Sequence, residues 1–597
     1  MSRPIWLKSP LAHQGSRPYF AAPSAFGGRD RVGSGKLSDP GGLAAVVLIL
    51  AVIIVLLFGI RETFAPVSSL RAISLDPAFL PDYAVRTVLR MLAAMMASLV
   101  FTLVYGTLAA RSRRAEVVLI PLLDILQSVP VLGYLSFTVA FFVKLAPHWV
   151  LGLELASIFA IFTSQAWNMA FSFYQSLRTI PLDLDEASRA FGFSAWQRFW
   201  RLEFSFAVPG LVWNMMMSMS GGWFFVVASE AITADKREFA LPGIGSYVAL
   251  AIERQDFAAI LWAIAAMTIV IVVYDQLLFR PLVVWADRFR VEQTAAQSVP
   301  HSWFLQSLRH SHLIEIAMRP VTFCSDRLFR APLLNLIQSA RPQFVRSRFS
   351  RLIDLIWYAI VAVVTVWAAS MIVRYVAREV GWSDVGTVLR LGAFTLLRVI
   401  VLIVLASLVW VPVGVAIGLR PKLAERVQPL AQFLAAFPAN LLFPLFVIPI
   451  VRFGLNTDVW LTPLMILGTQ WYILFNVIAG TSVFPTDFLE AAKSFHFRRW
   501  QWWRIVILPG IFPYYITGAI TASGGAWNAS IVAEVVSWGQ YHLYAHGLGA
   551  YISQATAAGD YPRIVLGIVA MSTFVVLFNR LLWRPLYGFS ERRLRLD

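Results

Sequence analysis

Long apolar segments alternate with short polar ones along most of the chain. In the first half they lie at 41–60, 84–110, 117–145, 149–174, 206–229 and 258–279. In the second half they lie at 353–373, 391–419, 429–451, 459–481, 510–533 and 563–583. A helix of about 20 apolar residues crosses a hydrocarbon core about 30 Å thick. The pattern therefore predicts an all-α integral membrane fold with about twelve transmembrane helices.

The two halves are tandem six-helix repeats. The stretch EASRAFGFSAWQRFWRLEFSFAVPG at 186–210 corresponds to EAAKSFHFRRWQWWRIVILPGIFPY at 490–514, a shift of 304 residues. Upstream the shift is 308, as between Pro130 and Pro438. The first repeat thus carries four extra residues before Trp167, which corresponds to Trp471. We expect a loop on the far side of the membrane to hold them, since loops tolerate insertions best.

The repeats divide the chain into four parts. A flexible basic tail at 1–40 precedes the first repeat at 41–282, and a basic linker at 283–350 precedes the second repeat at 351–597. The segment at 41–60 is too long for the core of a signal peptide, so we expect a retained span. In the linker, SWFLQSLRHSHLIEIAM has apolar residues at helical spacing. This pattern leaves two alternatives, a plain tether, which we favour, and an amphipathic helix on the inner leaflet.

Composition agrees with a membrane protein. Hydrophobic residues make up 58% of the chain and charged residues 14%, and the mean hydropathy is +0.68, outside the range of soluble domains. The net charge of +17 does not indicate a nucleic-acid partner, because the basic residues mostly flank apolar segments. A single cysteine, Cys324, excludes an intramolecular disulfide and a zinc site built from several thiolates. We predict no catalytic residue and no metal site.

The basic residues also predict the orientation in the membrane. Arg113 and Arg114 follow the second apolar segment, and Arg420 and Lys422 follow its counterpart. Loops rich in Lys and Arg stay in the cytoplasm. The alternation of spans then puts both termini, the linker and the repeated polar stretches in the cytoplasm.

The repeated polar stretch predicts a pair of short helices at an angle. In the first copy helix formers lead to a break near Gly192, a helical pattern resumes at Trp196, and Pro209 is expected to end it. Helices this short are unstable alone in water. The stretch therefore needs a partner surface.

This stretch resembles the coupling motif of the permeases of ATP-binding-cassette (ABC) importers, in which a short helix docks into a cleft of the ATPase subunit. The second copy has Leu508-Pro509 at its end, whereas the first has Phe204-Ser205 there and Ser188 for the second Ala. The residues that carry the motif, and are expected to contact the ATPase, are Glu186, Ala187 and Gly192 in the first copy and Glu490, Ala491, Ala492 and His496 in the second. We call 186–210 and 490–514 the two coupling segments.

The resemblance implies a fold like that of type I ABC importers, with two permease repeats fused in one chain of a bacterial-type inner (plasma) membrane. It implies three further partners besides membrane lipid: two ABC ATPase subunits and an extracytoplasmic substrate-binding protein. The stretch WYILFNVIAG and Gly547-Leu548-Gly549 most resemble the nitrate, sulfonate and taurine importers. The spans carry no readable code for the substrate.

The chain is not expected to be an enzyme or to hold a cofactor. Its nearest match to a phosphate-binding loop is VGSGKLS at 32–38. That match fails because Asp30 stands where the first Gly belongs and Leu37 where Ser or Thr belongs. ATP and magnesium are therefore expected in the separate ATPase subunits.

Polar residues at the ends of the fifth spans are candidates for the translocation path, since ionisable groups at membrane depth are costly and usually functional. The alternative is that the two Glu residues lie at the outer water boundary and cap the next segment. Arg90 and Arg398 are expected to extend their guanidinium groups to the interface rather than attract an anion. The candidate path residues are Trp223, Glu230, Trp527, Asn528 and Glu534.

A second function fits the same number of spans. Twelve spans in two six-span repeats also describe self-contained secondary transporters of the major facilitator type. Such a transporter should repeat an intramembrane coupling site. This chain repeats a cytoplasmic docking segment instead, which favours the importer.

Labelling of Cys324 tests the predicted orientation. A membrane-impermeant thiol reagent is expected to label Cys324 in inverted vesicles and to spare it in intact cells, because the linker is cytoplasmic. Mass spectrometry of the purified chain measures the labelled fraction. Efficient labelling from outside the cell would overturn the orientation.

Overall fold

The repeated pattern of apolar segments forms a repeated set of helices. The structure, a computed structural model, describes residues 66, 72–234, 237–289, 304–305, 348–482, 484, 490, 492, 494–497 and 499–593. The chain divides into two compact units. The first comprises Met1–Ala51, Phe173–Val212 and Arg280–Val345, and the second comprises Val52–Ser172, Trp213–Phe279 and Arg346–Asp597. The predicted tail at 1–40, the predicted span at 41–60, Ala491, and most of the linker with Cys324 lie outside the described residues.

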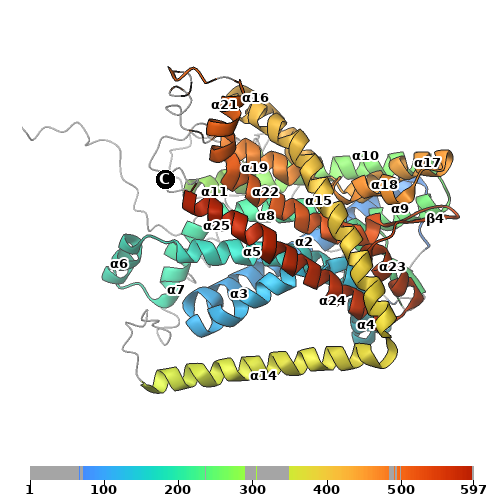
Figure 1. Cartoon of the computed structure of the whole chain (residues 1–597), viewed down its shortest axis with the longest axis horizontal. Helices are drawn as coiled ribbons and strands as arrows, with labels where there is room; N and C mark the ends of the chain where they lie inside the picture. Colours follow the sequence, from blue (N-terminus) through green and yellow to red (C-terminus); the bar gives the residue numbers. More distant parts are fainter. Residues whose placement is uncertain are drawn as a thin grey trace, which may run out of the picture. The chain divides into compact units, whose positions relative to one another are not determined.

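The first repeat contains the following elements (Figure 1): η2 (Pro77–Phe79), α2 (Leu80–Arg111), α3 (Arg113–Ser128), η3 (Val131–Tyr134), α4 (Leu135–Leu145), α5 (Leu151–Arg178), α6 (Leu182–Ala190), α7 (Ala195–Arg198), η4 (Phe199–Glu203), α8 (Phe204–Glu230), β1 (Ala231–Ala234), β2 (Arg237–Ala240), α9 (Ile244–Glu253), α10 (Phe257–Tyr274), η5 (Asp275–Phe279), α11 (Arg280–Ala286) and η6 (Asp287–Phe289).

The second repeat contains α14 (Arg348–Glu379), α15 (Trp382–Gly418), α16 (Pro421–Ala436), η8 (Ala439–Leu442), α17 (Phe443–Phe453), α18 (Thr457–Trp460), η9 (Thr462–Met465), α19 (Trp471–Ser482), α21 (Arg499–Gln501), η10 (Trp502–Ile507), α22 (Leu508–Ala533), β3 (Val535–Trp538), β4 (Tyr541–Tyr544), α23 (Leu548–Ala558), α24 (Tyr561–Phe578), η11 (Asn579–Trp583) and α25 (Arg584–Arg593).

The element boundaries confirm the sequence repeat. Helices α3, η3 and α4 begin 308 residues before α16, η8 and α17, and the β1–β2 hairpin, α10 and η5 begin 304 residues before the β3–β4 hairpin, α24 and η11. The shift changes between the end of α4 at Leu145 and Glu154, which occupies the same place in the fold as Asp458. The four extra residues thus lie around the α4–α5 connection.

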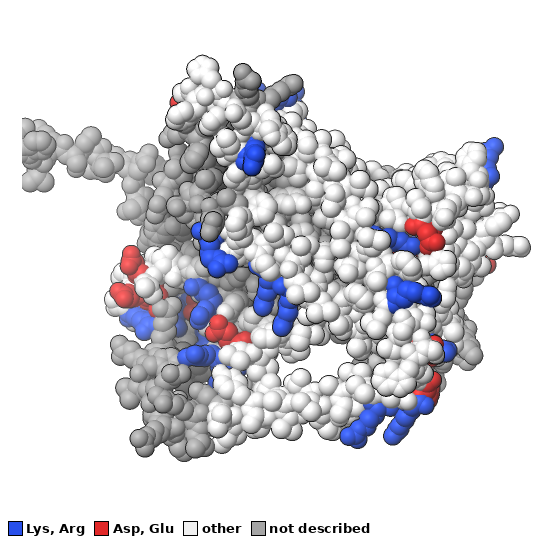
Figure 2. Space-filling view, viewed as in Figure 1, with Lys and Arg blue, Asp and Glu red and all other residues white. Residues whose placement is uncertain are grey.

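Long apolar helices dominate both repeats. In the described residues, seven are long and apolar enough to span a membrane: Pro77–Arg111, Ala195–Glu230, Phe257–Phe289, Leu355–Glu379, Trp382–Gly418, Trp502–Ala533 and Tyr561–Ser590. Figure 2 shows an uncharged surface along the middle of α15 and α24, with charged side chains toward their ends. This pattern confirms the integral membrane fold, and the total of twelve spans stays a prediction.

The third predicted span is broken in both repeats. The helices Lys422–Ala436 and Ala439–Phe453 meet at 80°. The break lies at Pro438, and Pro130 occupies the same place between α3 and η3. Proline forces the residue before it into an extended conformation, and Val129 and Phe437 have ψ of 124° and 127°. A continuous third span was therefore wrong.

The fourth predicted span of the second repeat is also broken. The segment 459–481 consists of the end of α18, the short η9 and then α19, with a turn between η9 and α19. Pro463 lies in η9 and lacks the N–H that a continuous helix needs there. The counterpart in the first repeat, α5, is continuous.

Pro209 does not end the helical segment, contrary to the sequence prediction. It lies inside α8, and Pro513 lies inside α22. A π-helical turn precedes each helix, η4 in the first repeat and η10 in the second. Proline is tolerated within membrane helices because local π-helical adjustments and neighbours satisfy the freed carbonyls.

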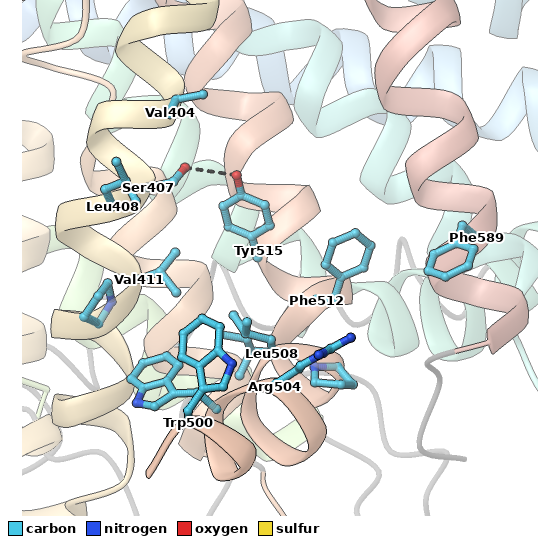
Figure 3. A pocket seen from close by; sticks show the side chains of 14 residues that line it. Val404, Ser407, Leu408, Val411, Trp500, Arg504, Leu508, Phe512, Tyr515 and Phe589 are labelled. Atoms are coloured by element: carbon cyan, nitrogen blue, oxygen red, sulfur yellow. Dashed lines mark hydrogen bonds between the residues drawn. The ribbon is translucent and has the colours of Figure 1, made fainter.

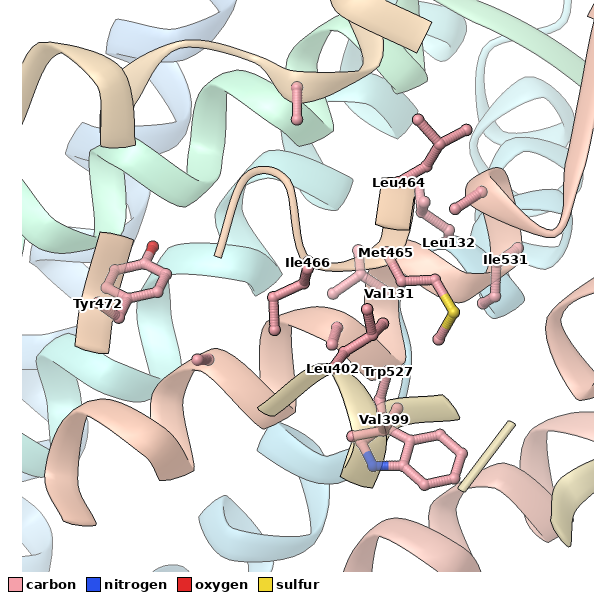
Figure 4. Packing of buried hydrophobic residues seen from close by; sticks show 14 of the residues in the cluster. Val131, Leu132, Val399, Leu402, Leu464, Met465, Ile466, Tyr472, Trp527 and Ile531 are labelled. Atoms are coloured by element: carbon pink, nitrogen blue, oxygen red, sulfur yellow. The ribbon is translucent and has the colours of Figure 1, made fainter. Parts of the chain in front are cut away.

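The largest group of buried hydrophobic residues joins the two repeats. Figure 4 shows Val131 and Leu132 of η3 close to Ile531 of α22 in this cluster. Polar contacts accompany the packing: the Val131 N–H donates to Oδ1 of Asn528 (2.9 Å), and Nδ2 of Asn440 donates to the Phe224 carbonyl (3.3 Å). The broken third span of each repeat therefore contacts the fifth span of the other.

Candidate functional site

The first coupling segment forms the predicted pair of short helices. Helix α6 ends in a turn at Gly192, and α7 begins after Ser194, whose side chain forms a capping box with Gln197. Asp185 of α6 pairs with Arg189 (3.0 Å) and with Arg198 of α7 (3.5 Å). One carboxylate thus connects the two short helices and fixes the bend between them.

The turn after the first short helix is the same in both copies, contrary to the expectation that Gly192 and His496 would differ. Both residues have positive φ, 69° for Gly192 and 50° for His496. In each copy the next N–H donates back five residues, from Phe193 to Ser188 (3.1 Å) and from Phe497 to Ala492 (3.4 Å). This bond is typical of a helix end capped by a left-handed residue.

His496 tolerates this left-handed conformation for a local reason. Histidine is among the side chains enriched at positive φ. Its Nδ1 lies 2.8 Å from the Ser494 carbonyl oxygen, a hydrogen bond within the turn. The loss of glycine therefore does not change the backbone of the second coupling segment at this position.

The motif residues divide into exposed and buried ones. Glu186 and Glu490 are exposed, whereas Ser188 and Ala492 are buried. The Ser188 hydroxyl donates to the Asp185 carbonyl (2.7 Å), so Ser satisfies its polar group inside its own helix. A small residue is all that this position requires, and the departure from Ala leaves the exposed Glu unaffected.

Each repeat contains a buried ion-pair cluster that sequence reasoning missed. The first ion-pair cluster consists of Thr87, Arg90, Glu154 and Glu230. The Nε and Nη2 atoms of Arg90 donate to both carboxylate oxygens of Glu154 (2.6 and 2.8 Å), and Nη1 donates to Oε1 of Glu230 (2.7 Å). Arg90 is 3% exposed and Glu230 is 0% exposed. Arg90 therefore does not reach the membrane interface, which corrects the sequence expectation.

Glu230 also caps the helix that follows it. Its Oε2 accepts from the Gly245 N–H at the start of α9 (2.7 Å), and its Oε1 accepts from the Thr87 hydroxyl (2.7 Å). That hydroxyl accepts in turn from the Ile244 N–H (3.1 Å). The carboxylate lies at the positive end of α9, where a negative charge is most favourable. The geometry favours the capping alternative for Glu230.

The second ion-pair cluster, Thr395, Arg398, Asp458 and Glu534, has the same design. Arg398 donates to Glu534 (3.1 Å) and to Asp458 (2.8 Å). Glu534 accepts from the Ala550 N–H of α23 (3.1 Å) and from Thr395 (2.9 Å). Two copies with the same partners show that the arrangement belongs to the repeat.

Glycines make room for each capping carboxylate. A Cβ atom at Gly243 would overlap the carboxylate of Glu230, and one at Gly547 would overlap that of Glu534. The repeated Gly-x-Gly that begins at Gly243 and Gly547 is thus explained by close approach of a side chain to a helix start.

The second cluster is more open than the first. The Asp458 side chain is 37% exposed, against 12% for Glu154, and it also pairs with His546 (2.9 Å). Burial raises the pKa of Asp458, but hydrogen bonds from the backbone and ring of His546 and the charge of Arg398 outweigh it, so the pKa lies below its ordinary value. Asp458 is therefore ionised at neutral pH.

The remaining candidate path residues lie in different surroundings. Trp223 and Trp527 are buried, and each packs on an aromatic ring of the sixth span of its own repeat, Tyr274 and Phe574. Asn528 alone among the five bonds to the other repeat. Whether any of them lines a path stays a prediction.

Both repeats match one known family. A family model described as the binding-protein-dependent transport system inner membrane component matches residues 81–280 and again residues 410–596. The chain belongs to this family. The double match confirms a fused pair of ABC importer permease repeats.

Curated relatives of this permease transport small solutes. It is 29% identical over 178 residues to the bicarbonate transport system permease protein CmpB of Synechococcus elongatus, covering 30% of this chain and 60% of the relative. It is 26% identical over 216 residues to the nitrate import permease protein NrtB of Leptolyngbya laminosa, covering 36% and 71%. It is 26% identical over 186 residues to the taurine transport system permease protein TauC of Escherichia coli, covering 31% and 64%. No solved structure matches the chain.

Substitution of the capping carboxylates tests the clusters. Glu230→Gln is expected to destabilise the purified chain by about 3 to 5 kcal/mol, because it breaks a buried ion pair. Glu534→Gln should cost less, because its cluster reaches water. Thermal unfolding in detergent measures both.

Glu253→Gln is the matched control, since Glu253 is exposed and should unfold like the wild type. Equal stability of the Glu230 variant and this control would contradict the cluster's structural role. Loss of uptake without loss of stability in the double Gln variant would instead support the path alternative, and unchanged uptake would remove both residues from the path.

Proposed function

We propose that this permease is the membrane-spanning subunit of an ATP-driven importer. Its two repeats form the translocation path, separate ATPase subunits dock on the two coupling segments, and an extracytoplasmic binding protein delivers the substrate. ATP and magnesium act in the ATPase subunits. The family match and the named transport permeases among the relatives support this proposal.

The observation that carries the proposal is the duplicated docking geometry. Each coupling segment presents an exposed Glu, and five residues later an exposed Phe, next to the same left-handed turn. Phe191 is 65% exposed and Phe495 is 72% exposed. Large apolar side chains exposed beside a charged group indicate a protein-binding surface. Two such surfaces fit two copies of one ATPase.

The substrate class follows from the relatives. Bicarbonate and nitrate are small inorganic anions, and taurine carries a sulfonate. We infer an anion of this kind as the substrate. The clusters of Arg90 and Arg398 do not serve as its binding site in this structure, because carboxylates already occupy both guanidinium groups.

Separate substitution of the two motif carboxylates tests the docking. Glu186→Ala and Glu490→Ala are each expected to impair transport, because a lost hydrogen bond to a charged group costs about 1.5 to 3 kcal/mol. The covalent fusion should keep the ATPase bound when one segment is damaged. Co-purification of the ATPase and uptake into cells measure both effects.

Asp183→Ala is the matched control, since Asp183 is exposed on the same short helix but lies outside the motif. Its ATPase binding and uptake should equal the wild type. We expect the two motif variants to differ in severity. Wild-type ATPase binding and uptake in both variants would overturn the docking assignment.

A further inference from the structure

An open groove with a volume of about 1070 Å³ lies on the second repeat. Helix α15 forms one side, η10 and α22 form the other, and α25 contributes one ring. Figure 3 shows Val404 at one end of the groove and Trp500 and Arg504 at the other. The lining residues are Val404, Ser407, Leu408, Val411, Pro412, Trp500, Trp503, Arg504, Leu508, Pro509, Ile511, Phe512, Tyr515 and Phe589.

The walls of the groove suit a hydrocarbon chain. Most of the lining side chains are aliphatic or aromatic. The hydroxyl groups of Ser407 and Tyr515 lie 3.0 Å apart and hydrogen-bond to each other, so these two polar groups satisfy one another. From Leu508 to Tyr515 the wall of α22 rises about 10 Å at 1.5 Å per residue. A polar solute would find few partners along this wall.

The end of the groove near Trp500 carries an available positive charge. Arg504 is exposed, and no carboxylate pairs with it in the part of the chain that the structure describes. Trp500 is 72% exposed beside it, and Trp503 also lines this end. Tryptophan and arginine together are typical of the boundary between hydrocarbon and headgroups.

The first repeat lacks this chemistry. At the positions equivalent to Arg504, Ser407 and Tyr515 it has Trp200, Leu99 and Leu211. The Trp200 ring packs on Phe204 with 5.1 Å between ring centres. The cation and the hydroxyl pair are therefore properties of the second repeat alone.

We propose that this groove binds one anionic phospholipid, with an acyl chain along α15 and α22 and the phosphate paired with Arg504. The groove belongs to membrane-spanning helices, and Leu408 on its rim is 67% exposed, so hydrocarbon is its natural surrounding. A soluble anion would use Arg504 but not the apolar walls. A neutral lipid would use the walls but not the charge.

Photolabelling of the full chain tests the site. The protein is placed in nanodiscs of phosphatidylcholine that contain a trace of photoactivatable phosphatidylglycerol, or of photoactivatable phosphatidylcholine with the same acyl chains. Mass spectrometry then maps the labelled peptides. Phosphatidylglycerol is expected to label the peptides with residues 404–412 and 508–515 about fivefold more than phosphatidylcholine, the factor of one basic residue near an anionic headgroup.

Variants separate charge from shape. Arg504→Gln should lower labelling by phosphatidylglycerol to the level of phosphatidylcholine, and Arg504→Lys should keep the preference. Leu408→Trp should lower labelling by both lipids, because the indole fills the groove. Arg420→Gln is the control, since Arg420 is exposed outside the groove and should change nothing.

Three results would overturn the proposal. Equal labelling by the two lipids in the wild type would remove the role of Arg504. An unlabelled groove would mean that a protein segment, from this chain or a second copy, occupies it. Loss of the preference in millimolar inorganic phosphate, with labelling otherwise unchanged, would indicate a site for a free anion.

Discussion

A buried carboxylate at the start of a helix, paired with a buried arginine, holds each repeat together. Glu230 ends α8, closes the β1–β2 hairpin through its carbonyl, caps α9 and binds Arg90 of α2. Arg90 in turn holds Glu154 of α5. A lone charge would be very costly inside a membrane protein. The three charges and the helix end therefore have to meet, and that requirement fixes the positions of four helices.

The same cluster in the second repeat lies at the far end of the helix that leaves the coupling segment. The turn at His496 leads through η10 into α22, which rises about 39 Å at 1.5 Å per residue before Glu534. In the proposed importer, a displacement of the turn by the ATPase would reach Arg398 and α23 through this one helix. The cluster would then transmit the movement to α15.

Much of this fold could be predicted because the chain contains its own comparison. The shifts of 304 and 308 residues located the spans, the coupling segments and the extra residues before α5. The broken third spans were only partly foreseen, although Pro130 and Pro438 marked both breaks. The angle at Pro438 depends on the contact of η8 with the other repeat, and such contacts are not visible in a hydropathy pattern.

The ion-pair clusters could not be assembled from the sequence for a similar reason. Arg90 and Glu230 lie 140 residues apart, and the third partner is Glu154 in one repeat and Asp458 in the other, which hid the correspondence. One signal was available: charged residues at equivalent places in two apolar segments of both repeats have to find each other. Gly243 and Gly547 carried the other signal, because they mark where the carboxylates approach a helix.

ATP-driven uptake in a reconstituted system tests the central claim most directly. Proteoliposomes would contain this permease and its ATPase, with the binding protein and labelled bicarbonate, nitrate or taurine outside and ATP inside, facing the ATPase. An ionophore would collapse any proton gradient. The account predicts uptake of one of these solutes that requires ATP and persists without the gradient. Uptake that needs the proton gradient and proceeds without ATP would contradict it and support a secondary transporter.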